Sequence, residues 1–297
     1  MKNRNRWLIS GLFLLMSLCG FSQQKAGTVD IFMGVDFNYR DIFWNNRVYD
    51  VLVNLTPGVK WNMGNRWEAA ALVHVPVYND YGDYYKYVRL YMATLSKQMI
   101  VGNHLKLKAT GGLFGTERYG IDLKGMLMVN DWLAFTVQAG LTGHCSMAYK
   151  WNCSKMERFT VLTGAQVYLH RWNTQLSAKG GRFVYGDYGI VGEGFRHFKH
   201  VSVGVYASYS DRAKENGGFK VVVMLPPYKR NRNRVNFRPA SNFRLTYNIE
   251  ADPYSNTMYK TDPEENERDG WFDCDLLPWG QNLMVPDFVE KRKEGAK

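Results

Sequence analysis

Residues 130–145 read NDWLAFTVQAGLTGHC, and this stretch decides the fold class. Apolar side chains occupy the odd positions from 133 to 141, and small or polar side chains occupy the even positions from 134 to 142. A period of two marks a β-strand whose two faces meet different surroundings. In a soluble sandwich the apolar face packs against a second sheet, whereas in an outer-membrane barrel it faces lipid.

The same alternation recurs along the body of the chain. It is clear in residues 29–37, 51–61 and 67–77. Further strands are expected at 88–101, 104–113, 119–129, 158–169, 174–183, 188–197, 201–210 and 218–226. With the strand that follows Asn130, these give about twelve strands, within a range of roughly ten to fourteen.

The connections between these strands alternate in length. Short turns rich in Gly, Asn and Asp, such as Met63–Arg66, alternate with longer polar connections at 40–50, 79–87, 143–157 and 210–218. Outer-membrane barrels have short periplasmic turns and longer outer loops, whereas a soluble sandwich has no physical reason to sort its loops in this way. We therefore predict an all-β fold, a closed antiparallel transmembrane β-barrel. Leu133, Phe135, Val137 and Leu141 are expected to face lipid, and Thr136, Gln138 and Thr142 the lumen.

The N-terminus has the features of a secretory signal. Lys2, Arg4 and Arg6 precede an apolar run over residues 7–18, which is shorter than the roughly 20 residues that a membrane-spanning helix needs. Small residues before position 23 suit cleavage there. We expect a signal peptide over residues 1–22 and a mature protein in the outer membrane of a Gram-negative cell.

The rest of the chain divides by charge. The barrel is expected over residues 23–228, a basic periplasmic segment with a possible extra strand over 229–250, and an acidic, partly disordered tail over 251–297. The tail carries 11 acidic and 6 basic side chains, whereas residues 23–250 carry 29 basic and 16 acidic ones. Such a body favours anionic partners, or the tail itself as its partner. A solvated tail is the preferred interpretation.

Alternation also assigns charged side chains to the lumen. The predicted inner bases are Lys60, Lys106, Lys108, Lys124, Lys179 and Lys220, against Asp30, Asp36, Glu68 and Asp122. A mildly basic lumen favours anions, so these lysines are candidates for contact with an anionic glycan. The alternative is a set of internal salt bridges that only fills the narrow interior of a barrel of this size.

Motifs of known chemistry are absent from the sequence. There is no Gly-x-Ser-x-Gly, Walker or His-Glu-x-x-His pattern, and 189–194 is only superficially a glycine-rich loop. Inward His74 has no serine assigned to it, and the cysteines lack the histidines of a zinc site. Cys145 and Cys153 flank a short polar stretch and are expected to pair as a disulfide in an oxidising compartment. We predict no catalytic residue, metal or cofactor.

Residues 180–245 resemble part of a known family. The matching elements are GGRFVYGDYGIVGEGFRHF, VSVGVYASYSD, GGFKVVVMLPP and FRPASNFRL, with Arg182, Asp187, Arg196 and Arg238 at motif positions. They resemble the C-terminal part of the YjbH-like outer-membrane β-barrel family, which is associated with exopolysaccharide and capsule production. The resemblance covers about a quarter of the chain. It implies an outer-membrane barrel linked to exopolysaccharide.

These observations together predict a non-catalytic role in export or surface assembly of an exopolysaccharide or capsular glycan. The expected partners are outer-membrane lipid, an anionic polysaccharide and periplasmic export proteins, with no nucleic acid. One alternative is a structural or binding barrel whose loops around Trp44, 81–87 and Trp151 hold a surface partner. A second alternative is a lipid-modifying outer-membrane enzyme.

Overall fold

The computed structural model describes residues 27–44, 47–102, 104–147, 151–198, 200–212, 214–225, 234–248 and 258–265, with the backbone alone for 40–44 and 47–48. The predicted signal peptide over 1–22 and most of the acidic tail lie outside these residues. Within them the fold is all-β, as predicted, with two short 3-10 turns, η1 (Asp83–Lys86) and η2 (His170–Trp172). None of the described helical segments is long and apolar enough to cross a membrane.

Fifteen strands carry the fold. They are β1 (Thr28–Trp44), β2 (Arg47–Gly64), β3 (Trp67–Asn79), β4 (Arg89–Val101), β5 (Leu105–Phe114), β6 (Arg118–Asn130), β7 (Leu133–Ser146), β8 (Asn152–Cys153), β9 (Arg158–Leu169), β10 (Thr174–Arg182), β11 (Tyr188–His197), β12 (Val201–Ser210), β13 (Lys214–Met224), β14 (Val235–Pro239) and β15 (Asn242–Asn248). Each predicted strand has a counterpart, and β14 and β15 follow the last of them.

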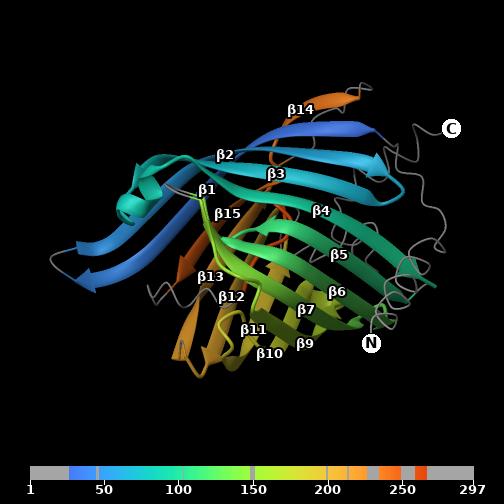
Figure 1. Ribbon diagram of the computed structural model, residues 1–297. Helices are drawn as coiled ribbons and strands as arrows, with labels where there is room; N and C mark the ends of the chain where they lie inside the picture. Colours follow the sequence, from blue (N-terminus) through green and yellow to red (C-terminus); the bar gives the residue numbers. More distant parts are fainter. Residues whose placement is uncertain are drawn as a thin grey trace, which may run out of the picture.

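The strands close into one barrel (Figure 1). Consecutive strands pair antiparallel from β1 to β13, with the short β8 attached only to the end of β7. β15 pairs antiparallel with β13 and parallel with β1, and β14 continues that parallel contact along the first part of β1. β14 and β15 therefore share one position, and thirteen positions surround the lumen.

The parallel pairing of β14 and β15 with β1, which we call the seam, corrects the expectation of a fully antiparallel barrel. In a barrel built from successive hairpins, an odd number of positions makes the first and last strands run in the same direction, so they can pair only in parallel. The register Asp36↔Arg244 to Arg40↔Asn248 shows this pairing. The predicted count of about twelve is close to the thirteen positions observed.

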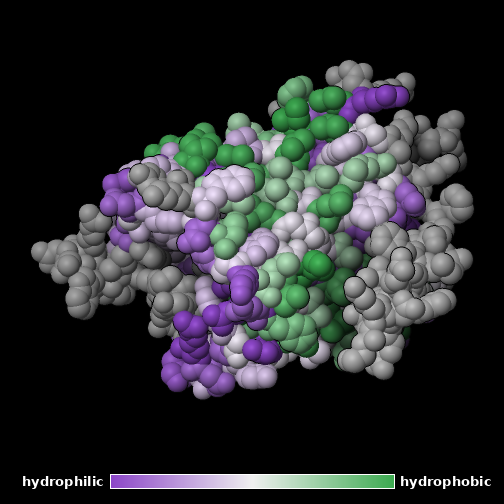
Figure 2. Space-filling view, in the orientation of Figure 1, coloured by the Kyte–Doolittle hydropathy of each residue, from purple (hydrophilic) through white to green (hydrophobic). Residues whose placement is uncertain are grey.

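The alternation within the strands sorts side chains as predicted. In β7, Phe135, Val137 and Leu141 are 49%, 45% and 43% exposed on the outer surface, whereas Thr136 and Thr142 are buried inside. Figure 2 shows apolar side chains over the middle of the wall and hydrophilic ones toward the end that carries η1 and the β12–β13 hairpin. The outer surface thus presents an extended apolar face, and the inner surface is polar.

The two ends of the barrel differ less in loop length than expected. The connections after β3 and β7 are long, as predicted, but β1 and β2 continue to a pair at Trp44 and Arg47. β12 and β13 likewise pair as far as Ser210 and Lys214. Two polar stretches expected as loops are therefore mostly strand, because cross-strand pairing continues beyond the apolar alternation.

The C-terminal part also differs from expectation. The possible extra strand within 229–250 is present as β15, and with β14 it completes the wall, so the barrel extends past the predicted boundary at 228. Residues 258–265, which we call the acidic segment, form no helix or strand and lie inside the barrel, where Tyr259 and Thr261 are 6% and 2% exposed. For this part of the tail, the preferred interpretation of a solvated chain is wrong.

Candidate functional site

All six lysines assigned to the lumen by alternation lie on the inner surface or line its cavity. Lys106, Lys108 and Lys124 are only 3–4% exposed. Lys60 contacts acids inside the barrel, and Lys179 and Lys220 line the interior cavity. Lys106 places its Nζ atom 3.4 Å from the sulfur of Met128. The inner placement predicted from the sequence is therefore confirmed, while contact with a glycan remains a prediction.

Three of these lysines bind the acidic segment. The Nζ atoms of Lys60 and Lys108 lie 3.2 and 3.3 Å from the Asp262 carboxylate. Lys124 lies 3.5 Å from Glu265 and donates a 2.9 Å hydrogen bond to the Thr261 hydroxyl. The chain thus supplies its own carboxylates to the basic lumen.

Arg238, one of the family-motif positions, binds the same segment from the seam. Its guanidinium makes two hydrogen bonds of 2.6 Å to the two carboxylate oxygens of Glu264 and a contact of 3.3 Å to Asp30. The planar guanidinium matches a carboxylate in this bidentate way. Glu264 also accepts the backbone N–H of Ser241, between β14 and β15. We call Lys60, Lys108, Lys124 and Arg238 the basic floor.

The surroundings keep the carboxylates of Asp262 and Glu264 ionised. Burial alone would raise the pKa of Asp262, but the ammonium groups of Lys60 and Lys108 outweigh it and hold that pKa well below its usual range. Burial likewise opposes ionisation of Glu264, and the hydrogen bonds from Arg238 outweigh it and lower its pKa. These two side chains are therefore held as anions.

An aromatic contact anchors the beginning of the segment. The Tyr259 ring stacks on Phe114 at 5.4 Å, and its hydroxyl donates a 2.7 Å hydrogen bond to Asp122. Gly140 lies beneath this hydroxyl, and a Cβ atom there would come within 1.9 Å of it. Glycine at position 140 thus makes the room that Tyr259 occupies.

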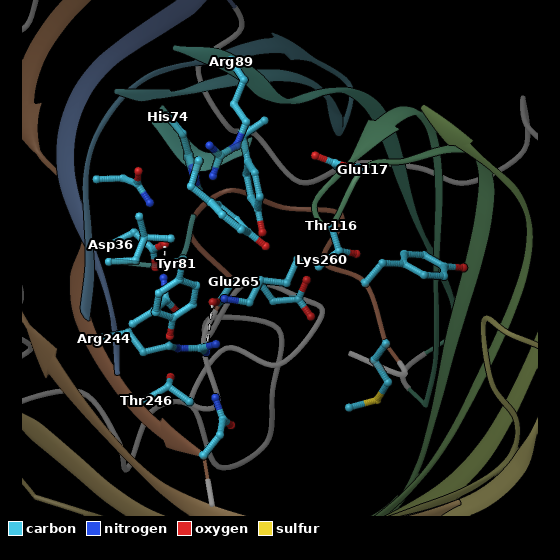
Figure 3. Close-up of a pocket in the computed structure, with 18 of the residues that line it drawn as sticks. Asp36, His74, Tyr81, Arg89, Thr116, Glu117, Arg244, Thr246, Lys260 and Glu265 are labelled. Atoms are coloured by element: carbon cyan, nitrogen blue, oxygen red, sulfur yellow. Dashed lines mark hydrogen bonds between the residues drawn. The ribbon is translucent and has the colours of Figure 1, made fainter. Parts of the chain in front are cut away.

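Beside the acidic segment, the lumen opens into a cavity of about 530 Å³, which we call the vestibule (Figure 3). Its lining includes the connections after β3, β5, β7 and β10, so it lies toward the end of the barrel opposite the short turns. Lys260 and Glu265 form part of its wall, and Arg244 donates a hydrogen bond to the Glu265 carbonyl. A ligand in the vestibule would therefore meet the acidic segment.

One wall of the vestibule carries a polar cluster, Asn54, His74 and Arg89, on the neighbouring strands β2, β3 and β4. These side chains are 1%, 4% and 7% exposed. Among the described residues, both amide atoms of Asn54, His74 Nδ1 and Arg89 Nη1 have no hydrogen-bond partner. Buried polar atoms are normally hydrogen-bonded, so this cluster has the features of a ligand contact.

Aromatic rings lie directly against the polar cluster. Tyr91 stacks on His74 with ring centroids 3.8 Å apart, and the Arg89 guanidinium lies 5.0 Å from the centre of the Tyr85 ring. Figure 3 shows His74 and Arg89 side by side on one wall, with Glu117 across the cavity. The site therefore combines flat apolar surfaces with directional hydrogen-bonding groups.

Elsewhere in the vestibule the charges are paired within the wall. Lys220 lies 2.6 Å from Glu193 and 4.9 Å from the centre of the Tyr206 ring. Glu117, in the connection after β5, lies 3.3 Å from His144. Burial raises the pKa of Glu117 to about 7, against the opposing effect of Arg118. The charge at this point of the rim therefore changes near neutral pH.

The other positions that carry the sequence resemblance, Arg182, Asp187 and Arg196, lie at or near the ends of β10 and β11. Phe183, adjacent to Arg182, is fully buried against Leu162, Val191 and Met258. It forms one end of the connection that Asp187 closes, with the Phe183 backbone N–H bound to the Asp187 carbonyl at 2.8 Å. The guanidinium of Arg196 lies 5.7 Å from the centre of the Phe198 ring, at an exposed position on the short-turn end.

Cys145 and Cys153 form a disulfide, as predicted, and pair directly between β7 and β8. Cys145 is 3% exposed and belongs to β7, so the disulfide ties the β7–β9 connection to the wall.

A serine and a histidine do meet inside the barrel, at a place that the sequence did not indicate. His197 Nδ1 lies 2.8 Å from the Ser202 hydroxyl, and its Nε2 lies 3.1 Å from Gln175. Ser202 is fully buried, and neither it nor His197 lines the vestibule. No cluster of three or more metal-ligating side chains occurs among the described residues.

The comparisons with known proteins identify no family for this chain. No family model matches the chain, and no curated protein of similar sequence was found. The functional argument therefore depends on the site itself. The sequence identified the lysines of this site and missed Tyr259, Asp262 and Glu264. The opposite charges of body and tail were the signal that points to these residues.

Proposed function

We propose that this protein is an outer-membrane β-barrel that binds a glycan in its vestibule, without catalysis, during export or surface assembly of an exopolysaccharide or capsular glycan. The observation that carries the proposal is the polar cluster of Asn54, His74 and Arg89 beside the Tyr85 and Tyr91 rings. Sugars present hydroxyl groups at their edges and apolar C–H faces, so their binding sites combine hydrogen-bonding groups with aromatic surfaces.

The placement in a membrane is supported by the outer surface. Large apolar side chains are exposed along the strands, among them Ile121, Leu123, Phe135 and Val205. An apolar band of this kind around a closed barrel with a polar interior is typical of outer-membrane barrels. A monomeric mature protein that stays dissolved without detergent would contradict this part of the proposal.

A binding role is supported by the position of the acidic segment inside the lumen. The acidic segment occupies the basic floor, and its Asp262 and Glu264 carboxylates bind wall cations. The resemblance of residues 180–245 to exopolysaccharide barrels supports a glycan as the ligand. Export proteins in the periplasm are the partners that this role implies.

Binding of short oligosaccharides to the purified full chain in detergent tests the proposal. Isothermal titration with an oligogalacturonate and with a maltooligosaccharide of equal length should show binding of at least one of them. Asn54→Ala should weaken it about tenfold, because hydrogen bonds to a buried amide are lost. Asn130→Ala, at the exposed last residue of β6 on the opposite end of the barrel, is the matched control. Equal affinity of both variants would refute the assignment of the vestibule.

The alternatives predict different outcomes. A surface-binding barrel would depend on exposed loop residues such as Trp151, which is 75% exposed, and not on Asn54. A lipid-modifying enzyme would change the lipid A or phospholipids of a deletion strain, which mass spectrometry detects. Unchanged lipids are the result expected from the proposed binding role.

A further inference from the structure

The acidic segment is held by side-chain contacts, many of them ion pairs, and hardly by backbone hydrogen bonds. Within the described residues, a single backbone hydrogen bond joins it to the wall strands and their connections, from the Gly115 N–H to the Lys260 carbonyl at 3.0 Å. Its other bonds use side chains, chiefly Asp262 with Lys60 and Lys108, and Glu264 with Arg238. A wall strand has a backbone ladder on both sides, so the segment can leave the lumen without opening the barrel.

Removal of the acidic segment from the basic floor costs free energy, because cations of the floor such as Lys108 are buried. Lys108 is 4% exposed, and Asp262 is the carboxylate within ion-pair distance of it. Removal of the segment would take away the carboxylate nearest to this buried ammonium group and leave it with the more distant charge of Glu68, which is unfavourable. A neutral sugar cannot replace the carboxylate, whereas another anion can.

The four cations also have the arrangement of a site for an extended ligand. Lys60, Lys108 and Lys124 come from β2, β5 and β6, and Arg238 comes from β14 at the seam. They bind three carboxylates within four consecutive residues, Asp262 to Glu265. The acidic segment thus shows how a chain with repeated carboxylates fits this floor.

We infer that the basic floor is a second ligand site, specific for a linear carboxylated oligosaccharide, and that the acidic segment is its internal, displaceable occupant. For the sugar nature of the ligand this inference rests on the proposed function. Because Lys260 and Glu265 also line the vestibule, a glycan bound there lies against the occupant that it must replace. The acidic part of the glycan then takes the place of Asp262 and Glu264.

Hydrogen exchange of the full chain in detergent tests displacement directly. At low ionic strength, an oligogalacturonate should raise the exchange of residues 258–265 about tenfold or more while the wall strands stay protected. A maltooligosaccharide of equal length should leave the segment protected, because it has no carboxylates. Unchanged exchange with the acidic sugar would overturn the inference.

A pair of variants separates the floor from the vestibule. Lys60→Met combined with Lys108→Met should reduce the affinity for oligogalacturonate about tenfold, since two cations of the floor are lost. Lys86→Met, at an exposed lysine beside Asp83, is the matched control and should bind as the wild type does. If oligogalacturonate binds with Asn54-dependent affinity and leaves the segment protected, the proposed function stands and the second site is refuted. If neither sugar binds by titration, both proposals fail.

Discussion

The basic floor and the vestibule both contain buried polar and charged side chains, but they differ in whether those side chains have hydrogen-bond or ion-pair partners. In the basic floor, each cation has a carboxylate within 4.0 Å, and the acidic segment supplies several of these carboxylates. In the vestibule, Asn54, His74 and Arg89 keep buried polar atoms without a partner among the described residues. A region of paired charges and a region of buried polar atoms without partners thus lie side by side, and Lys260 and Glu265 of the acidic segment line the second region.

This difference teaches that charge alone does not identify the binding site. The lysines are the most conspicuous inner residues in the sequence, yet the structure shows them engaged by the chain itself. The vestibule is marked by an amide and an imidazole next to tyrosine rings, which have little signal in the sequence. The substitutions and pH changes that follow each alter one of these two regions.

The largest effect is expected from Asp262→Asn. The change leaves Lys60 and Lys108 without their shared counter-charge and should destabilise the docked segment by about 3 kcal/mol. Hydrogen exchange of residues 258–265 measures this, with Asp211→Asn at an exposed turn as the control. Vestibule binding that requires Asn54 should persist, and its loss would show that the two regions are one site.

The same ion pair predicts the response to acid. The folded-state pKa of Asp262 is depressed below the unfolded value of 3.8, so its stabilising contribution is present above that value and is lost as pH falls through the folded pKa. Acidification from about pH 7 to about pH 5 should therefore leave the segment docked. Release of the segment in this interval, detected by hydrogen exchange, would contradict the ion-pair geometry.

Loss of the disulfide should affect only the vestibule rim. The double change Cys145→Ser and Cys153→Ser removes a constraint on a loop with a sequence separation of 8, worth about 2.5 kcal/mol of local stability. Exchange should rise at β8 and the end of β7, while the acidic segment stays protected. Heat-modifiable migration on gels checks that the barrel remains folded, and its loss would show that the disulfide holds the wall.

Gly140→Ala tests the boundary between the two regions. The new methyl group would displace the Tyr259 hydroxyl from Asp122 and weaken docking of the segment by about 1 to 2 kcal/mol. Gly192→Ala is the matched control, because nothing lies within 4 Å of its Cβ position. Equal exchange of residues 258–265 in the two variants would exclude Tyr259 as an anchor.

The smallest effect is expected at Glu117. Its carboxyl group has a pKa of about 7 because of burial, so a rise in pH from about 6 to about 8 adds a negative charge to the rim near Arg118 and His144. Affinity for an acidic oligosaccharide should fall about threefold over this interval. Glu117→Gln should remove this pH dependence of the affinity. If the variant keeps the pH profile of the wild type, a group other than Glu117 causes the dependence.

Much of the wall was predictable because strand alternation is a local property. Phe135 and Thr136 face opposite sides for the same reason in any pleated strand, and the inner position of Lys108 follows from the same rule. The Cys145–Cys153 pair was also predictable from its spacing. The limits of the hairpins were not, because pairing continues through polar stretches such as residues 40–50.

The residue pattern alone predicts a β-barrel with an apolar exterior and a basic interior, because the alternation within each strand assigns its two faces. The parallel closure of the wall by β14 and β15, and the binding of Asp262 and Glu264 to the basic floor, are visible only in the folded barrel. The pairing of β15 with β1 and the contact of Lys60 with Asp262 join residues about 200 positions apart in the sequence. No local pattern encodes such a distance, because it follows from closure of the barrel around its own tail.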